Sequence, residues 1–440
     1  MKRKVNSGLA LWQRAKRMIP GGSQLLSKRS EQFLPDQWPS YYRSAKGVEV
    51  RDLDGRRYID MSLLGVGACP LGYADPDVDR AVKEAIDQGS MCTLNCPEEV
   101  ELAEALLRLH PWAEMARFSR GGGEAMAVAV RIARARTGRE TVAFCGYHGW
   151  HDWYLAANLA DDRNLDGHLL PGLEPRGVPR GLKGTAIPFR YNEIEDLRAI
   201  VNHHAGSLAA VVMEPVRDHE PVPGFLREVQ ELAAAAGALL VVDEVSAGFR
   251  LNTGGAHLVY GIHPDIAVFA KGMSNGYPMA AIIGTGDAMS AAQETFISST
   301  YWTDRIGPVA ALATIEKYRR CDVPGHLIRV GKEVQDLWAR CGEDAGLPLE
   351  IEGIPPLSHF TFHNREALLL QTLFTQMMLE QGFLAGRAFY ASFAHSDAHI
   401  NAYRDAAREA FRDIAAGVQE GNVADLLKGP VAHSGFRRLT

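Results

Sequence analysis

Five short segments in the middle of the chain are apolar along their whole length, and they constrain the fold more than any other feature. Each spans five or six residues and is flanked by glycine, proline or polar residues, with helical stretches between them. A strand that is apolar on both faces is typical of a mostly parallel sheet covered by helices on both sides. The segments are 141–145, 208–213, 238–242, 266–270 and 280–284.

The pattern changes toward both ends of the chain. Residues 48–51 and 57–59 flank Asp54-Gly55, which predicts a hairpin, and beyond residue 305 helical stretches dominate with a few strand-like pieces. We therefore expect an α/β protein with three segments. Residues 1–74 form an N-terminal segment that joins the small domain, residues 75–305 form a large domain, and residues 306–440 form a smaller α+β domain.

Composition excludes several classes of protein. The net charge of −6 argues against a protein that binds nucleic acid or an anionic membrane, and no apolar run approaches the ~18 residues of a membrane span. The six cysteines lack the paired spacing of a zinc site, so we expect no metal and reduced thiols. The expected location is the cytoplasm.

In a sheet of this kind the ligand binds at the carboxyl ends of the strands, so the residues that follow the apolar segments are candidates for chemistry. Tyr147 and His148 follow segment 141–145, Asp243 follows 238–242, and Lys271 follows 266–270. Each also has an ordinary structural explanation, such as a core aromatic, a surface carboxylate or a lysine whose amine reaches water.

A glycine turn adds an anion site to this set. Gly121, Gly122 and Gly123 precede a helical stretch, and a helix N-terminus with bare glycines favours an anion, although a plain turn has the same appearance. Taken together, the features predict a site for pyridoxal 5′-phosphate (PLP). The lysine would hold the aldehyde, the aspartate the pyridine nitrogen, the tyrosine ring would stack, and the glycine N–H groups would bind the phosphate.

Longer motifs carry a resemblance to a known family. The chain resembles the class III aminotransferases, which are fold type I PLP enzymes, and within them it is most similar to the glutamate-1-semialdehyde 2,1-aminomutase branch. The resemblance implies the fold type I architecture, with a mostly parallel sheet of seven strands in the large domain. The matching stretches are 20–22, 52–60, Glu214-Pro215, 224–250, 254–272 and 394–400.

The resemblance also implies roles for individual residues. Lys271 would form a Schiff base with the cofactor, and Asp243 would pair with its pyridine nitrogen. Val245 would pack on the ring face opposite Tyr147. Thr300 would cap the phosphate of the partner subunit, which implies a homodimer with shared active sites. The cofactor-binding set is Gly122, Gly123, Tyr147, His148, Glu214, Asp243, Val245, Lys271 and Thr300.

The sequence departs from the family pattern at the residues expected to bind the cofactor's phosphate and the substrate's carboxylate. The family's Ser-Gly-Thr phosphate turn is replaced by three glycines, so two hydroxyls are missing. Thr303 is the alternative to Thr300 as phosphate cap. Lys28 or Arg29 stands near the place of the arginine that grips the substrate carboxylate in the aminomutase, and His219 is a further substrate-binding candidate.

The reaction that we expect is transamination from an amino donor, with glutamate as the common choice, to a small carbonyl acceptor. Lys271 would act as the proton-transferring base and acid. Three alternatives use the same residues: an aminomutase that moves the amino group within one molecule, an epimerase, and an aminotransferase that acts on an amino sugar. A further alternative, of another class, is a PLP-binding regulator or an inactive homologue.

Overall fold

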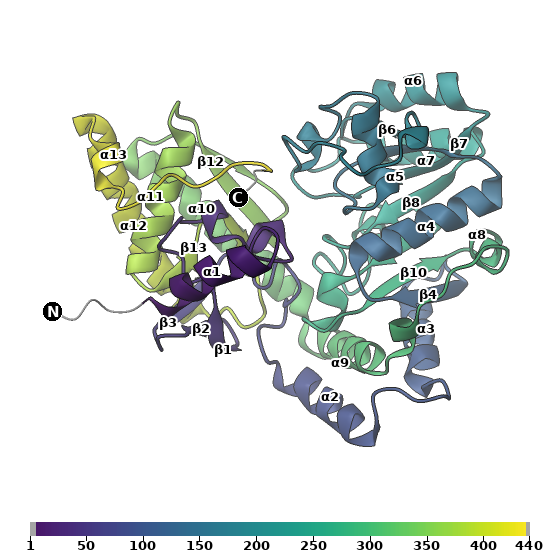
Figure 1. Cartoon of the computed structure of the whole chain (residues 1–440), viewed down its shortest axis with the longest axis horizontal. Helices are drawn as coiled ribbons and strands as arrows, with labels where there is room; N and C mark the ends of the chain where they lie inside the picture. Colours follow the sequence, from purple (N-terminus) through teal and green to yellow (C-terminus); the bar gives the residue numbers. More distant parts are fainter. Residues whose placement is uncertain (1–5, 437–440) are drawn as a thin grey trace. The chain divides into compact units, whose positions relative to one another are not determined.

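The computed structural model describes residues 6–436, and its contacts divide the chain into two compact units (Figure 1). The larger unit is Pro76–Gly325; the smaller unit combines residues up to Asp75 with those from His326 onward. Helix α9 (Ile306–Cys321), which the sequence analysis placed in the C-terminal segment, belongs to the larger unit in this division. Its Lys317 forms an ion pair of 3.1 Å with Asp77 on α2 (Pro76–Gln88), which ties the helix to that unit.

The larger unit contains a seven-stranded sheet in the order β4-β10-β9-β8-β7-β5-β6. Strand β10 runs antiparallel to both of its neighbours, and the other pairs in the sheet are parallel. This confirms the expected fold type I architecture. The strands are β4 (Met115–Ser119), β5 (Thr141–Cys145), β6 (Ala186–Pro188), β7 (Leu208–Met213), β8 (Leu239–Asp243), β9 (Ile266–Phe269) and β10 (Ala280–Gly284).

Helices on both faces explain why the central strands are apolar throughout. Along β5, Val142 and Phe144 pack in the core that includes α4 (Gly122–Thr137), whereas Ala143 and Cys145 pack with α6 (Ile194–His204) and α7 (Phe225–Ala235). Burying such a side chain stabilises the fold by about 1.5–3 kcal/mol. The remaining helices of this unit are α3 (Pro97–Leu109), α5 (Asp152–Leu155) and α8 (Gly286–Ser290).

Two strands of this sheet were not expected from the sequence, and both lie at its edges. Strand β6 has only three residues, and the residues of β4 before Ser119 are exposed or half-buried. An edge strand is covered incompletely, so it lacks the continuous apolar run that identifies a central strand.

The smaller unit has two sheets, β1-β2-β3-β13 and β11-β12-β14. Strands β2 and β3 pair antiparallel across the turn at Asp54-Gly55, which confirms the predicted hairpin. The elements are α1 (Ser7–Met18), β1 (Tyr42–Lys46), β2 (Glu49–Asp52), β3 (Arg57–Met61), α10 (Val323–Ala345), β11 (Leu349–Glu352), β12 (Leu357–Phe362), α11 (Ala367–Glu380), β13 (Phe383–Ala385), β14 (Ala388–Tyr390), α12 (Asp397–Glu420) and α13 (Val423–Leu426).

Candidate functional site

Most of the candidate residues lie at the carboxyl ends of the parallel strands, which all face the same side of the larger unit's sheet. Asp243 is the last residue of β8, Glu214 follows β7, and Tyr147 lies two residues beyond β5. Lys271 follows β9 and begins the 3₁₀ turn Lys271–Ser274. Because these strands are neighbours and run in the same direction, the topology alone gathers the side chains.

Lys271 has an unusual backbone and an unusual amine. Its φ of 44° is in the left-handed region, which residues other than glycine adopt at an energetic cost and often at functional sites. The half-buried side chain donates a hydrogen bond of 3.0 Å from Nζ to Ser246 Oγ. Burial, and then the Arg217 guanidinium, lower the pKa of Lys271 to about 8. The amine therefore loses its proton more readily than an ordinary lysine, as a nucleophile requires.

This pKa gives a testable pH dependence in the cofactor-free protein. Only the neutral amine attacks an aldehyde, so the rate at which Lys271 captures added PLP should rise with pH around a midpoint near 8. Stopped-flow absorbance measures that rate. Arg217→Met should move the midpoint upward, because the guanidinium disfavours the charged amine. A midpoint near the ordinary lysine pKa of 10.5 would show that burial and Arg217 do not lower the pKa of Lys271.

The Asp243 carboxylate is buried and held from two sides. It is 2% exposed; Oδ1 accepts the Val245 N–H at 2.9 Å, and Oδ2 lies 2.7 Å from His148 Nδ1. The other nitrogen of that ring, Nε2, donates to the Cys145 carbonyl at 3.1 Å. Each carboxylate oxygen retains a lone pair for one more donor. His148 thus acts on the site through Asp243, by fixing the orientation of the carboxylate.

Glu214 organises the loop that carries Tyr147. One carboxylate oxygen, Oε2, accepts the Tyr147 N–H at 3.0 Å, and the other, Oε1, pairs with Arg217 at 3.2 Å. Gly146 is required beside it, because its φ is 111° and a Cβ there would lie 2.6 Å from Oε2. The structure therefore places Glu214 as a support for the Tyr147 loop.

The glycine turn leads directly into α4. Glu124 Oε2 accepts the backbone N–H groups of Arg120 at 3.0 Å and Gly121 at 3.3 Å. The N–H groups of Gly122 and Gly123 lie in the first helical turn, where an α-helix offers no internal acceptor, so they are available to an anion. A Cβ at Gly122 would lie 2.7 Å from Val245 Cγ1, which shows how closely that side chain approaches the turn.

Arg120 ties this turn to the segment of Thr300. Its guanidinium donates to the carbonyl oxygens of Trp302 at 3.0 Å and Asp304 at 2.6 Å. The side chains of Thr300 and Thr303 are both exposed, and the Thr303 hydroxyl donates to the Thr300 carbonyl at 2.9 Å. The arginine therefore braces the backbone of a segment whose two threonines are exposed.

The substrate-binding candidates are divided between the two units. Lys28 is exposed and Arg29 half-buried, and both belong to the smaller unit. His219 is in the larger unit and is exposed. The role of all three in substrate binding stays a prediction.

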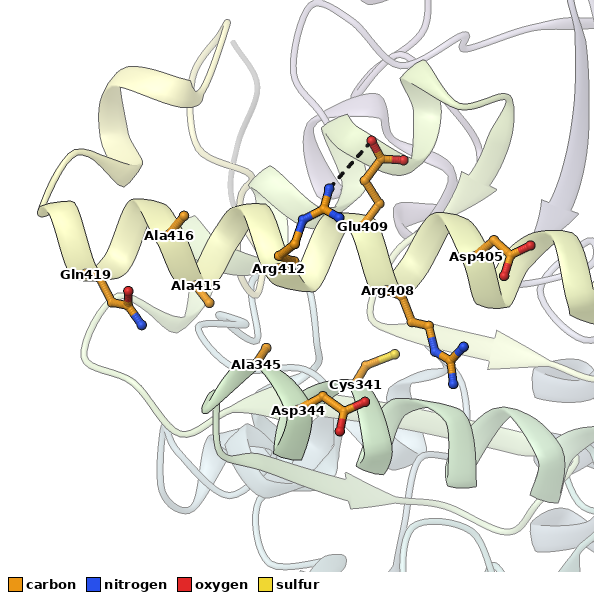
Figure 2. A pocket seen from close by; sticks show the side chains of 10 residues that line it. All are labelled: Cys341, Asp344, Ala345, Asp405, Arg408, Glu409, Arg412, Ala415, Ala416 and Gln419. Atoms are coloured by element: carbon orange, nitrogen blue, oxygen red, sulfur yellow. Dashed lines mark ion pairs between the residues drawn. The ribbon is translucent and has the colours of Figure 1, made fainter.

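A separate hollow lies in the smaller unit, between α10 and α12 (Figure 2). Its lining mixes acids and bases, and Arg412 pairs with Glu409 there at 3.9 Å. Burial raises the pKa of its one thiol, that of Cys341, to about 11, so that thiol is a poor nucleophile. No residue of the strand-end group lines this hollow, and its chemistry does not suggest a second active site.

Three residues near the candidate site were not predicted from the sequence: Ser246, Arg217 and His151. Ser246 lies three residues after Asp243, and Arg217 lies three residues after Glu214. Neither directly follows a predicted strand, so the search at strand ends did not include them. His151 reaches the glycine turn through a loop, and no periodicity marks such a contact. Over residues 6–436, no helix is long and apolar enough to cross a membrane.

Comparison with known proteins places this geometry in context. The aminotransferase class-III family matches residues 35–349. The chain is 32% identical to the 3-aminobutyryl-CoA aminotransferase of Cloacimonas acidaminovorans over 85% of this chain and 88% of that one. It is 33% identical to the glutamate-1-semialdehyde 2,1-aminomutase of Thermomicrobium roseum over 94% and 99%. Among solved structures, the FumI protein of Sphingopyxis sp. MTA144, in its PLP form, is similar with a TM-score of 0.85 at 26% identity, covering 94% and 98%.

Proposed function

Since this chain belongs to the class III aminotransferases, a PLP-dependent family of amino-transfer enzymes, we propose that it passes an amino group between two separate substrates. The donor is an amine such as glutamate, and the acceptor is a small carbonyl compound. The observation that carries the proposal is that Lys271, on its left-handed turn, and the buried Asp243 lie at the same ends of two neighbouring parallel strands, β9 and β8.

The residues at the strand ends fit PLP part by part. When bound, PLP supplies an aldehyde for amines and a ring that withdraws electrons from the substrate's α-carbon. Lys271 offers a readily deprotonated amine, and Asp243 offers carboxylate oxygens to a ring N–H. The N–H groups of Gly122 and Gly123 suit a phosphate, and a side chain at Gly122 would collide with Val245.

The chain's own groups then divide the work. Lys271 Nζ takes a proton from the donor's α-carbon in the first half of the reaction. In the second half it gives a proton to the carbon that was the carbonyl carbon of the acceptor. Asp243, oriented by His148 and the Val245 N–H, keeps a proton on the ring nitrogen. We assign the two faces of the flat ring to Tyr147 and Val245.

The requirement for two substrates is the test of this function. When purified protein with bound PLP is mixed with a donor alone, the absorbance of the cofactor should change by a single turnover and then stay constant. Addition of an acceptor should restore the original absorbance. Glutamate, alanine and ω-amines serve as donors; short aldehydes, keto acids and keto sugars serve as acceptors. Sustained turnover of glutamate-1-semialdehyde alone would instead identify an aminomutase, and inversion of a single substrate without amino transfer would identify an epimerase.

We also propose a homodimer with shared sites, in which Thr300 serves the phosphate of the partner chain. The outward side chain of Thr300, and the brace from Arg120 behind it, support this assignment. Light scattering tests it, because an active particle with the mass of one chain would contradict it. We place the protein in the cytoplasm, which agrees with six cysteines that are all free thiols.

A further inference from the structure

We infer that His151 is a ligand of the cofactor's phosphate, and that its ring lies beside Gly123, within contact distance of the position of a Cβ there. The inference rests on the proposed placement of PLP at this turn. It concerns a residue outside both the glycine turn and the strand ends.

The contact between the His151 loop and the turn is close. A Cβ built on Gly123 would lie 3.4 Å from His151 Nδ1 and 3.6 Å from its Cε1. The loop reaches this position because Gly149, with φ of 104°, lies against the turn; a Cβ there would be 2.8 Å from Gly123 Cα. The absence of a Cβ on Gly149 thus allows the loop to approach the turn closely, which brings the His151 ring beside Gly123.

The ring nitrogen nearest the turn has no partner. His151 Nδ1 is buried and forms no hydrogen bond within residues 6–436. Buried polar atoms in native proteins are nearly always paired, so this nitrogen is open to a partner from outside the described chain. The ring stacks on Trp150, with centroids 4.3 Å apart and planes at 29°.

The charges at the turn explain why such a donor is needed. Glu124 places a carboxylate beside the anion site, and the Arg120 guanidinium is directed to the carbonyls of Trp302 and Asp304. Burial lowers the pKa of His151, while Glu124 and Asp152 act to raise it. A neutral imidazole carries one N–H, and with that hydrogen on Nδ1 the ring would donate to a phosphate at the turn.

The experiment compares PLP with pyridoxal, which has the same ring and aldehyde but no phosphate. His151→Phe keeps an aromatic ring against Trp150 and removes both nitrogens. We expect its dissociation constant for PLP to rise at least about tenfold, as for the loss of one hydrogen bond to a charged group. The constant for pyridoxal should not change. The ³¹P resonance of bound PLP should also shift relative to that of the unaltered protein.

Two further variants keep the test decisive. His151→Gln, which retains a donor, should recover part of the PLP affinity and serves if the phenylalanine variant fails to fold. His203→Phe, the same substitution at an exposed histidine on α6, is the matched control and should leave both constants near their original values. Equal losses for PLP and pyridoxal, or no loss for either, would overturn the role of His151. Failure of the unaltered protein to attach PLP at Lys271 would instead refute the proposed function.

Discussion

Replacing Lys271 by alanine is expected to abolish amino transfer while leaving the protein folded. The substitution removes the proposed nucleophile and proton carrier together, so turnover should fall to background and the absorbance of lysine-bound cofactor should vanish. The backbone cost of φ at 44° is similar for lysine and alanine, so the fold gains no new strain. Rates with saturating donor and acceptor, and spectra after addition of PLP, measure the two losses.

The sign of the stability change follows from the lowered pKa. Because the pKa of Lys271 is about 8 in the folded protein and 10.5 in the reference state, the charged amine is disfavoured by folding. That destabilisation is fully present below about pH 8 and fades as the pH rises toward 10.5. The alanine variant should therefore melt no lower than the parent at pH 7, by circular dichroism. Lys183→Ala, at an exposed lysine, is the control and should retain full activity.

Asp243→Asn is expected to keep PLP bound but to slow turnover by several orders of magnitude. A neutral amide cannot hold a proton on the pyridine nitrogen, and each 1.4 kcal/mol added to the barrier costs about a factor of ten in rate. The shape of the side chain is preserved, and the Val245 N–H still finds an oxygen acceptor. Single-turnover rates with donor alone isolate the affected step from substrate release.

A matched control lies on the same sheet. Asp265 precedes β9 at the opposite edge, where its carboxylate accepts the Leu240 N–H at 2.7 Å. Asp265→Asn should change stability slightly and leave the turnover rate close to that of the parent. Near-normal turnover in Asp243→Asn, or an equal loss in both variants, would show that Asp243 does not serve the cofactor ring.

The strands at the centre of the sheet were predictable because burial on both faces leaves a direct mark in the sequence. The runs 141–145, 208–213 and 280–284 coincide with β5, β7 and β10, and the other two runs differ from β8 and β9 by a residue. Asp243 and Lys271 each directly follow one of these apolar runs, and this position at the carboxyl end of a predicted strand marked them as candidates. The edge strands β4 and β6 were missed. Strand β4 is mostly exposed or half-buried, and β6 has only three residues, so neither has a continuous apolar run.

The sequence alone determined the architecture of the larger unit and the residue types of its chemistry, because both depend on local patterns repeated along the chain. Tertiary structure decided which groups meet. It turned Glu214 toward the Tyr147 backbone, set His148 against Asp243, and brought the orphan nitrogen of His151 to Gly123. Those contacts join loops that are far apart in the sequence and are shaped by glycines with positive φ. Their geometry arises from packing in three dimensions, which no periodicity of residues encodes.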